Sequence, residues 1–167
     1  MLVDDARGPL SRLGTPWRCT TDRVMGGVSE ASLSGVEAEG RPWRRLRGGV
    51  RLDNDGGFVQ MGLDLAPDGG TLDLSAFEGL RLLVVGNGET YGLHLRTRDC
   101  RHPWESYRAA FAAGPVPAEV DFPFKDFIPH RLDAPFDPAR LRRLALIAIG
   151  REFQADLWLG RIEAVPR

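Results

Sequence analysis

The chain has 167 residues and a formal net charge of −1, from 22 basic and 23 acidic side chains. This balance argues against the capture of nucleic acid or of an anionic membrane by bulk charge. The length is that of one domain with a self-sufficient core. The longest uninterrupted apolar run, residues 144–149, is far shorter than the roughly 20 residues of a membrane-spanning helix, so membrane insertion is not expected.

The first 16 residues contain two glycines and two prolines and show little apolar periodicity. They are expected to be a tail or lead-in that lies across the domain, with a single domain over residues 17–167. Asp4 and Asp5 stand where a secretory signal carries basic charge, which excludes a signal of that type. A cytoplasmic location is therefore expected. All basic residues except Lys125 are arginine, which we interpret as the codon bias of a GC-rich bacterial genome.

Cofactor and metal motifs are absent from the sequence. It contains no nucleophile elbow, phosphate-binding loop or dinucleotide fingerprint, so neither a cofactor nor a recognisable catalytic residue is expected. The three histidines lack the spacing of a zinc site. Residues 53–56 match only part of a calcium loop, so a turn is favoured there, and a calcium site built from distant loops stays open. Cys19 and Cys100 are expected to be free thiols, with a single disulfide as the alternative.

The least ordinary stretch of the chain follows Trp17 and ends near residue 29. Adjacent glycines between two apolar residues indicate backbone that bends sharply or approaches another element closely. One interpretation is a bulged strand capped by Asp22. The other is a rigid loop that presents Asp22 and Arg23 to a ligand or partner. The candidate binding residues of this stretch are Asp22, Arg23, Met25, Gly26, Gly27 and Ser29.

Strands are predicted over much of the remaining chain. Apolar residues alternate with polar ones over 61–65, 91–95 and 120–124, which is typical of strands with one solvated face. Residues 80–85 and 144–149 are apolar on both faces, which predicts central strands. Residues 86–88, Gly-Asn-Gly, predict a hairpin turn, and only 138–143 indicate a helical turn.

Eight to ten strands are predicted from Ser29 onward. Without long helices, such a set is expected to close as an all-β fold: an antiparallel β-sandwich of jelly-roll type. The polar face of the strand at 91–95 carries His94 and Arg96, and Trp104 and Tyr107 follow closely in sequence. Aromatic faces stack on sugar rings while such polar groups orient hydroxyls, so these four are candidate ligand contacts. The alternative is a solvated outer face.

An ordered series of motifs runs through the chain. It begins with Trp17-x-x-x-x-Asp22-Arg23-Val24-Met25-Gly26-Gly27-Val28-Ser29 and continues with Gly56-Gly57-Phe58, Gly86-Asn87-Gly88-x-x-Tyr91, Tyr107-x-x-x-Phe111, Pro123-Phe124-x-x-Phe127 and Phe153-x-x-x-Leu157-x-Leu159-x-x-Ile162. Over about residues 17–165 this series resembles the complex I intermediate-associated protein 30 family. The resemblance implies a jelly roll of the galactose-binding-like type, similar in fold to carbohydrate-binding modules. It also implies kinship with mitochondrial assembly chaperones of respiratory NADH:ubiquinone oxidoreductase.

Two departures from the family pattern leave the fold unaffected. Gly86-Asn87-Gly88 replaces a frequent Gly-Asp-Gly, and Arg151-Glu152 replaces a Gly-Pro before the last strand. A mitochondrial targeting segment is not recognised at the acidic start of the chain, so the assembly role is carried over by family alone.

Three functions are weighed on this basis. The first is a non-enzymatic binding protein that holds a protein subunit or assembly intermediate, which for this family would be a respiratory complex subunit. It predicts exposed aromatic anchors, for which Trp43, Trp104 and Tyr107 are candidates. The second is a carbohydrate or small-molecule binding domain that uses the face with His94 and Arg96. The third, given less weight, is an enzyme of unknown reaction built on the jelly roll.

Overall fold

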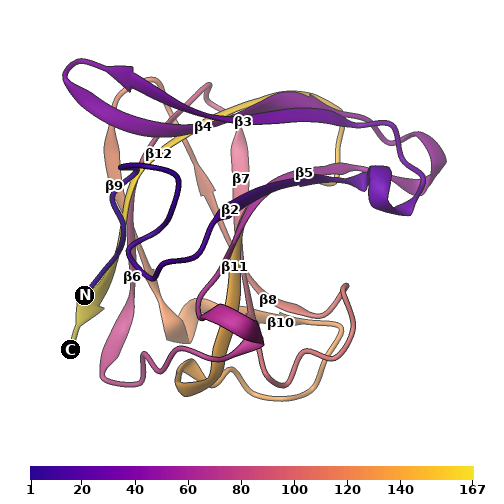
Figure 1. Ribbon diagram of the computed structural model, residues 1–167. Coiled ribbons are helices and arrows are strands. Elements are labelled where there is room, and N and C mark those ends of the chain that lie inside the picture. The colour runs from indigo at the N-terminus through magenta and orange to yellow at the C-terminus, as the bar shows by residue number, and fades with distance from the viewer.

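Twelve strands form two antiparallel sheets in the computed structural model, which describes residues 1–167 (Figure 1). The strands are β1 Leu2–Asp4, β2 Trp17–Thr21, β3 Glu30–Ala38, β4 Arg41–Val50, β5 Phe58–Asp64, β6 Phe77–Gly86, β7 Thr90–Thr97, β8 Ser106–Ala112, β9 Ala118–Pro123, β10 Ile128–His130, β11 Leu141–Ile149 and β12 Phe153–Pro166. Short 3-10 turns occupy η1 Asp22–Met25, η2 Asp53–Asp55, η3 Pro67–Gly69, η4 Phe124–Asp126 and η5 Pro138–Arg140. None of these helical segments has the length and apolar character needed to cross a membrane.

The two sheets have six strands each. One runs in the order β3-β4-β12-β6-β9, with β1 added beside β12, and the other in the order β10-β8-β7-β11-β5-β2. This is the predicted antiparallel sandwich of jelly-roll type. Ten of the strands follow Ser29, at the top of the predicted range. The two stretches that are apolar on both faces became β6 and β11, and each is flanked by a strand on both sides, as predicted.

The core lies between the sheets and contains 30 buried residues. In β7, Tyr91, Leu93 and Leu95 point into it, as the alternation predicted, and each is no more than 2% exposed. In β11, Leu144 and Leu146 do the same. Alternation therefore assigns the residues between them, His94 in β7 and Ala145 in β11 among others, to the outer face of their sheet.

The N-terminal lead-in adds a short strand to one of the sheets. Leu2–Asp4 pair with β12, and Val3 belongs to the buried core. The buried Asp4 carboxylate accepts hydrogen bonds from Arg44 Nε at 2.7 Å and Nη2 at 2.9 Å, and from Trp17 Nε1 at 3.2 Å. The two chain ends meet, because Ala164 N donates to Met1 O at 2.8 Å (Figure 1).

The turn at residues 86–88 was predicted correctly as a turn but wrongly as a hairpin. Its flanking strands β6 and β7 belong to different sheets, so the turn is an arch between the two layers. Gly86 N and Gly88 N donate to the carbonyls of Gly114 and Ala113 rather than across a hairpin. Asn87 Nδ2 donates to Gln154 O at 2.8 Å, which fixes the arch to β12.

Candidate functional site

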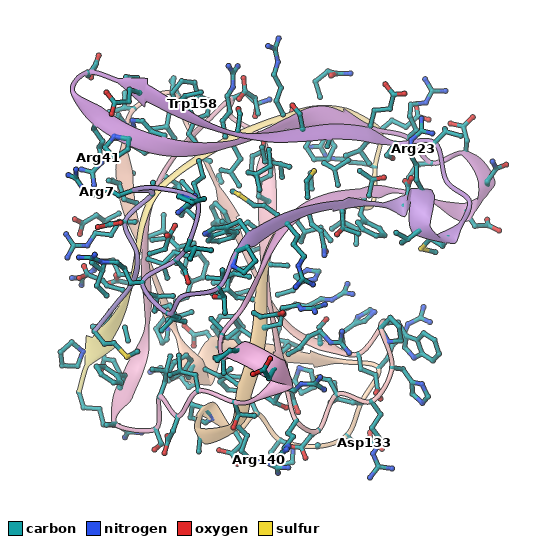
Figure 2. The ribbon with its side chains drawn as sticks, viewed as in Figure 1. Arg7, Arg23, Arg41, Asp133, Arg140 and Trp158 are labelled. Carbon is teal, nitrogen blue, oxygen red and sulfur yellow. The ribbon has the colours of Figure 1, made fainter.

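A groove of about 520 Å³ crosses the outer face of the sheet β10-β8-β7-β11-β5-β2. Strands β5, β7, β8 and β11 form its floor. One wall is the segment 22–29 with Gly56 and Gly57, hereafter the η1 loop. The other wall is the β7–β8 loop, residues 98–105, which contributes Pro103 and Trp104. In Figure 2 the groove opens to the right, between the segment that carries Arg23 and the loops below it.

Strand register brings basic and apolar side chains together on the floor. Arg108 of β8 is opposite His94 of β7, and His94 is opposite Ala145 of β11. One step along β11, Ile147 is opposite Gln60 of β5. Although these side chains lie on an outer face, Ala145 and Ile147 are only 7% and 3% exposed. The floor is therefore sheltered from solvent to a degree that an ordinary outer face is not.

His94, Arg96 and Arg108 give the floor its electrostatic character. Burial, together with Arg108 and His130 nearby, lowers the pKa of His94 to about 3, so its imidazole is neutral at physiological pH. Burial also lowers the pKa of Arg96 and of Arg108, but a guanidinium stays charged in proteins. The floor thus holds the cations Arg96 and Arg108 beside a neutral histidine, together with Arg143, which pairs with Asp64.

The η1 loop is held in place by Asp22, whose carboxylate is fully buried. Oδ2 accepts from Ser29 Oγ at 2.5 Å, from Gly57 N at 2.6 Å and from Phe58 N at 3.2 Å, and Oδ1 accepts from Ser29 N at 2.9 Å. Burial opposes ionisation of Asp22, but these hydrogen bonds outweigh it and lower its pKa. A Cβ on Gly27 would lie 2.3 Å from Asp22 Oδ1, so only glycine fits there.

Asp22 and Ser29 therefore build the loop and do not face a ligand, which corrects their selection as contact residues. Asp22 is 0% exposed, so its carboxylate is not presented to a partner at the surface. Arg23 is exposed, but its Nε donates to Ser29 O at 3.0 Å and its Nη2 to Glu30 Oε1 at 2.9 Å. Gly26 ends the turn in the left-handed region, with φ of 88°.

The residues that the η1 loop presents are apolar. Val24 is 75% exposed and Met25 is 59% exposed, and both line the groove. Large apolar side chains this exposed on a rigid loop are typical of a binding surface rather than of a solvated turn. Met25 was among the residues predicted from the sequence and Val24 was not, although the adjacent apolar pair before two glycines was a usable signal.

The opposite wall presents an aromatic pair. Trp104 is 53% exposed and stacks on His102, with ring centres 4.6 Å apart and planes within 3°. Glu105 Oε1 accepts from the backbone N–H groups of Arg101 and His102 at 2.8 Å, which orders the loop. Arg96 Nη2 donates to His102 O at 3.2 Å and joins this wall to the floor.

Two aromatic candidates lie elsewhere. Tyr107 is fully buried in the core, and its hydroxyl donates to Ala134 O at 2.7 Å. The reason is register: Tyr107 is opposite Leu95, so it shares the core face, while its neighbour Arg108 is opposite His94. Sequence reasoning therefore chose Tyr107 and missed Arg108, since the strand offset of β8 cannot be read from alternation alone. Trp43 lies on the outer face of the other sheet and is 5% exposed.

A second hollow, of about 610 Å³, adjoins the groove and shares His94, Arg108 and Ile149 with it. It continues past β8 toward β9 and β10, where it includes His130 and Asp126. His94 and Arg108 thus stand where the two hollows meet. No three His, Cys, Asp or Glu side chains cluster in a way that would hold a metal ion, and both cysteines are free thiols.

Comparison with solved structures places the fold in a known class. A family 11 carbohydrate-binding module from Clostridium thermocellum, solved with a β-1,3-1,4-mixed-linked tetrasaccharide, has a TM-score of 0.76 at 14% identity, over 99% of this chain and 94% of that one. A family 30 carbohydrate-binding module of a cellulosomal cellulase from the same organism has a TM-score of 0.59 at 18% identity, over 80% and 82% of the two chains. An exo-β-agarase has a TM-score of 0.59 at 11% identity, with this chain covering 25% of it.

These similarities define the fold: a β-sandwich of galactose-binding-like type, with the jelly roll that carbohydrate-binding modules share. Identities this low establish the fold alone. No curated protein matches the chain in sequence. The model of the complex I intermediate-associated protein 30 family matches residues 10–158. The chain belongs to that family, as its motif series predicted.

Proposed function

We propose that this protein is a non-enzymatic binding protein that holds a segment of a protein partner in the groove. For a member of this family, the partner would be a subunit or assembly intermediate of the respiratory NADH:ubiquinone oxidoreductase. The observation that carries the proposal is the exposure of Val24, Met25 and Trp104 on two facing walls. Protein interfaces centre on such aromatic, thioether and arginine side chains.

The chemistry of the groove favours a protein segment over a sugar. Sugar hydroxyls both donate and accept hydrogen bonds, so their recognition needs acceptors as well as donors. The floor offers the donors Arg96 and Arg108, whereas Asp55 is the one carboxylate among the residues that line the groove. Met25 adapts its shape to irregular apolar surfaces, which suits a side chain of a partner better than a sugar ring.

A carbohydrate or small-molecule ligand is the second candidate. The observation that favours it is the coplanar stack of His102 and Trp104, which forms a flat aromatic platform at the groove edge. The tetrasaccharide complex of the family 11 module, with the same fold, adds support. In either case the two free thiols fit a reducing compartment, and we include a cytoplasmic location in the proposal.

Site-specific photo-crosslinking in the native host tests the proposal. A photoreactive phenylalanine analogue replaces Met25 on the groove wall in one variant and Arg47 on the outer face of the other sheet in the control. We expect respiratory complex subunits to be crosslinked from position 25 and not from position 47. The adducts should map to one segment of the partner.

Equal crosslinking from both positions, or none from position 25, contradicts the proposal. The carbohydrate candidate is measured in parallel by titrating the purified protein with a mixed-linked β-glucan tetrasaccharide and following the Trp104 indole N–H signal. Saturable shifts of that signal, with no adduct from position 25, would replace the protein partner by a sugar.

A further inference from the structure

Two arginines on the groove floor differ from every comparable arginine in the protein. Five of the seven half-buried or buried arginine side chains face a carboxylate or an aromatic ring: Arg41 lies over Trp43, Arg44 pairs with Asp4, Arg45 with Asp156, Arg81 with Asp121 and, within the groove itself, Arg143 with Asp64. Arg96 and Arg108 are also half-buried, yet neither forms an ion pair or lies over a ring.

The hydrogen bonds of these two side chains leave donors free toward the groove. Arg108 uses only its Nε, which donates to Ser106 Oγ at 2.9 Å. Arg96 donates through Nη2 to the backbone carbonyl of His102 and also interacts with the Cys100 thiol, and its Nε is buried without a hydrogen-bond partner. Both residues line the groove beside the same histidine, His94. Apart from the buried Arg96 Nε, the guanidinium nitrogens not engaged by the protein are the donors left for a ligand in the groove.

An arrangement of this kind is unfavourable in the free protein. Other guanidiniums repel each side chain, Arg142 and Arg143 acting on Arg96 and Arg131 acting on Arg108, and each has lost part of its hydration without gaining an ion-pair partner. Burial lowers the pKa of both guanidiniums for this reason. An anion placed between them would supply the missing charge and accept the free N–H groups, and a carboxylate matches the planar geometry of a guanidinium.

We propose that Arg96 and Arg108 form a carboxylate-binding pair, and that they recognise acidic side chains of an extended protein segment whose apolar residues contact Met25 and Trp104. This inference rests on the proposed function and names the chemistry of the partner segment. The segment combines acidic and apolar residues because the groove combines a basic floor with apolar walls. Asp55 on the wall is the one carboxylate that lines the groove, so its charged residues are mainly basic and complement an acidic segment.

The test uses two fluorescent ten-residue peptides with blocked ends. Both contain leucine and alanine, and one has Glu at every third position where the other has Gln. Binding is measured by fluorescence anisotropy, and the arginine Nε–H signals of the protein are followed by NMR. We expect the Glu peptide to bind at least about tenfold more tightly, since hydrogen bonds between charged groups are the strong ones. The Arg96 and Arg108 signals should shift on binding.

Matched variants locate the effect. Arg96→Gln and Arg108→Gln should each weaken binding of the Glu peptide about tenfold or more and leave the Gln peptide unchanged. Arg47→Gln removes the same charge from an exposed position outside the groove and should change neither affinity more than about twofold. A loss in Arg47→Gln equal to that in Arg108→Gln would show that only net charge matters, and would overturn the proposal.

The remaining outcomes separate this inference from the proposed function. Equal binding of both peptides, weakened by Trp104→Ala, overturns the carboxylate pair but keeps the protein-binding groove. Shifts of the Arg96 and Arg108 signals with tri-galacturonate and with neither peptide overturn both, because the carboxylate would then come from a sugar. No shift with any probe overturns the carboxylate pair, and the crosslinking experiment decides the function by itself.

A ligand-free measurement checks the same idea. Arg108→Met replaces the uncompensated charge by an apolar side chain of similar length, so the melting temperature should rise by about 2–4 °C. Arg45→Met, which breaks the ion pair with Asp156, should lower it instead. A fall in both variants would mean that Arg108 is already stabilised within the protein and would contradict the proposal.

Discussion

The outer faces of the two sheets both carry arginine and tryptophan side chains, but these side chains differ in whether they have partners within the protein. On the sheet β3-β4-β12-β6-β9, Arg45 lies over Trp158 and forms two hydrogen bonds with Asp156, at 2.9 and 2.8 Å. Trp43 meets Trp158 edge to face, with ring centres 6.3 Å apart. Figure 2 shows Trp158 and Arg41 along this side of the molecule, away from the groove. On the groove face, Arg96 and Arg108 have neither an ion-pair partner nor a ring beneath them, and Trp104 is 53% exposed although it stacks on His102. The two faces therefore differ in which groups lack a partner within the protein, not in their composition.

The largest effect expected from this comparison concerns Trp43. Because it is 5% exposed and packs against Trp158, Trp43→Ala should lower the free energy of unfolding by about 3–5 kcal/mol. Binding of the Glu peptide should be unchanged in the folded fraction. Chemical denaturation measures the first and anisotropy the second. A stability loss below about 1 kcal/mol would mean that Trp43 is less buried against Trp158 than its contacts indicate.

The next effect concerns the wall of the groove. Asp22→Asn keeps the size of the side chain but removes one of two acceptor oxygens, and it places an NH₂ group near backbone donors such as Gly57 N. We expect a loss of about 2–3 kcal/mol in the free energy of unfolding. Arg23→Gln, on the exposed surface of the same loop, should change it by less than about 0.5 kcal/mol. Equal losses in the two variants would refute the distinction between a buried support and an exposed residue.

The pH dependence of stability tests whether His94 on the groove floor is sheltered from solvent. The pKa of His94 is about 3 in the folded protein and near 6.5 when unfolded, so below pH 6.5 the unfolded state binds a proton that the folded state does not. Stability should therefore fall by about 2 kcal/mol between pH 7 and pH 5. The slope should be smaller in His94→Gln, with the residual slope due to His130, whose pKa is also lowered. Parallel curves for the two proteins would place His94 in solvent.

The smallest effect on stability is expected at Trp104. Because this ring is 53% exposed, Trp104→Ala should change the free energy of unfolding by less than about 0.5 kcal/mol. The same substitution should weaken the binding of the Glu peptide by about tenfold or more, as the loss of an aromatic anchor does. Replacing Trp104 should thus weaken binding without a loss of stability, whereas replacing Trp43 should lower stability without a loss of binding. A large loss of stability in Trp104→Ala would contradict the conclusion that Trp104, unlike Trp43, is not needed for folding.

The sequence predicted the architecture well because strand alternation and two-faced apolar runs are local signals. The alternation at Tyr91, Leu93 and Leu95 and the run at 144–149 were sufficient to place β7 and β11. The arch at Asn87 was wrongly predicted as a hairpin, since turn chemistry does not record which sheet the next strand joins. That choice depends on distant partners such as Gln154.

The candidate site was predicted only in part, and the errors at Tyr107 and Asp22 arise from contacts with residues distant in sequence. His94, Arg96, Met25 and Trp104 line the groove as a group. Tyr107 was selected in place of Arg108 because cross-strand register, which sets the face of each β8 residue, has no signature within β8 itself. Asp22 was predicted either to cap a strand or to contact a partner. Only the positions of Ser29, Gly57 and Phe58 show that it holds the loop.

The exposure of Trp104 gives the protein a natural spectroscopic probe. Of its four tryptophans, Trp43 is buried, Trp17 and Trp158 are half-buried, and Trp104 alone is exposed. Light emitted by this indole should lie at the long-wavelength end of the spectrum and should be quenched by acrylamide. When the groove fills, the emission should move to shorter wavelength and the quenching should weaken. Occupancy is therefore readable from the unlabelled protein, without any substitution in the site.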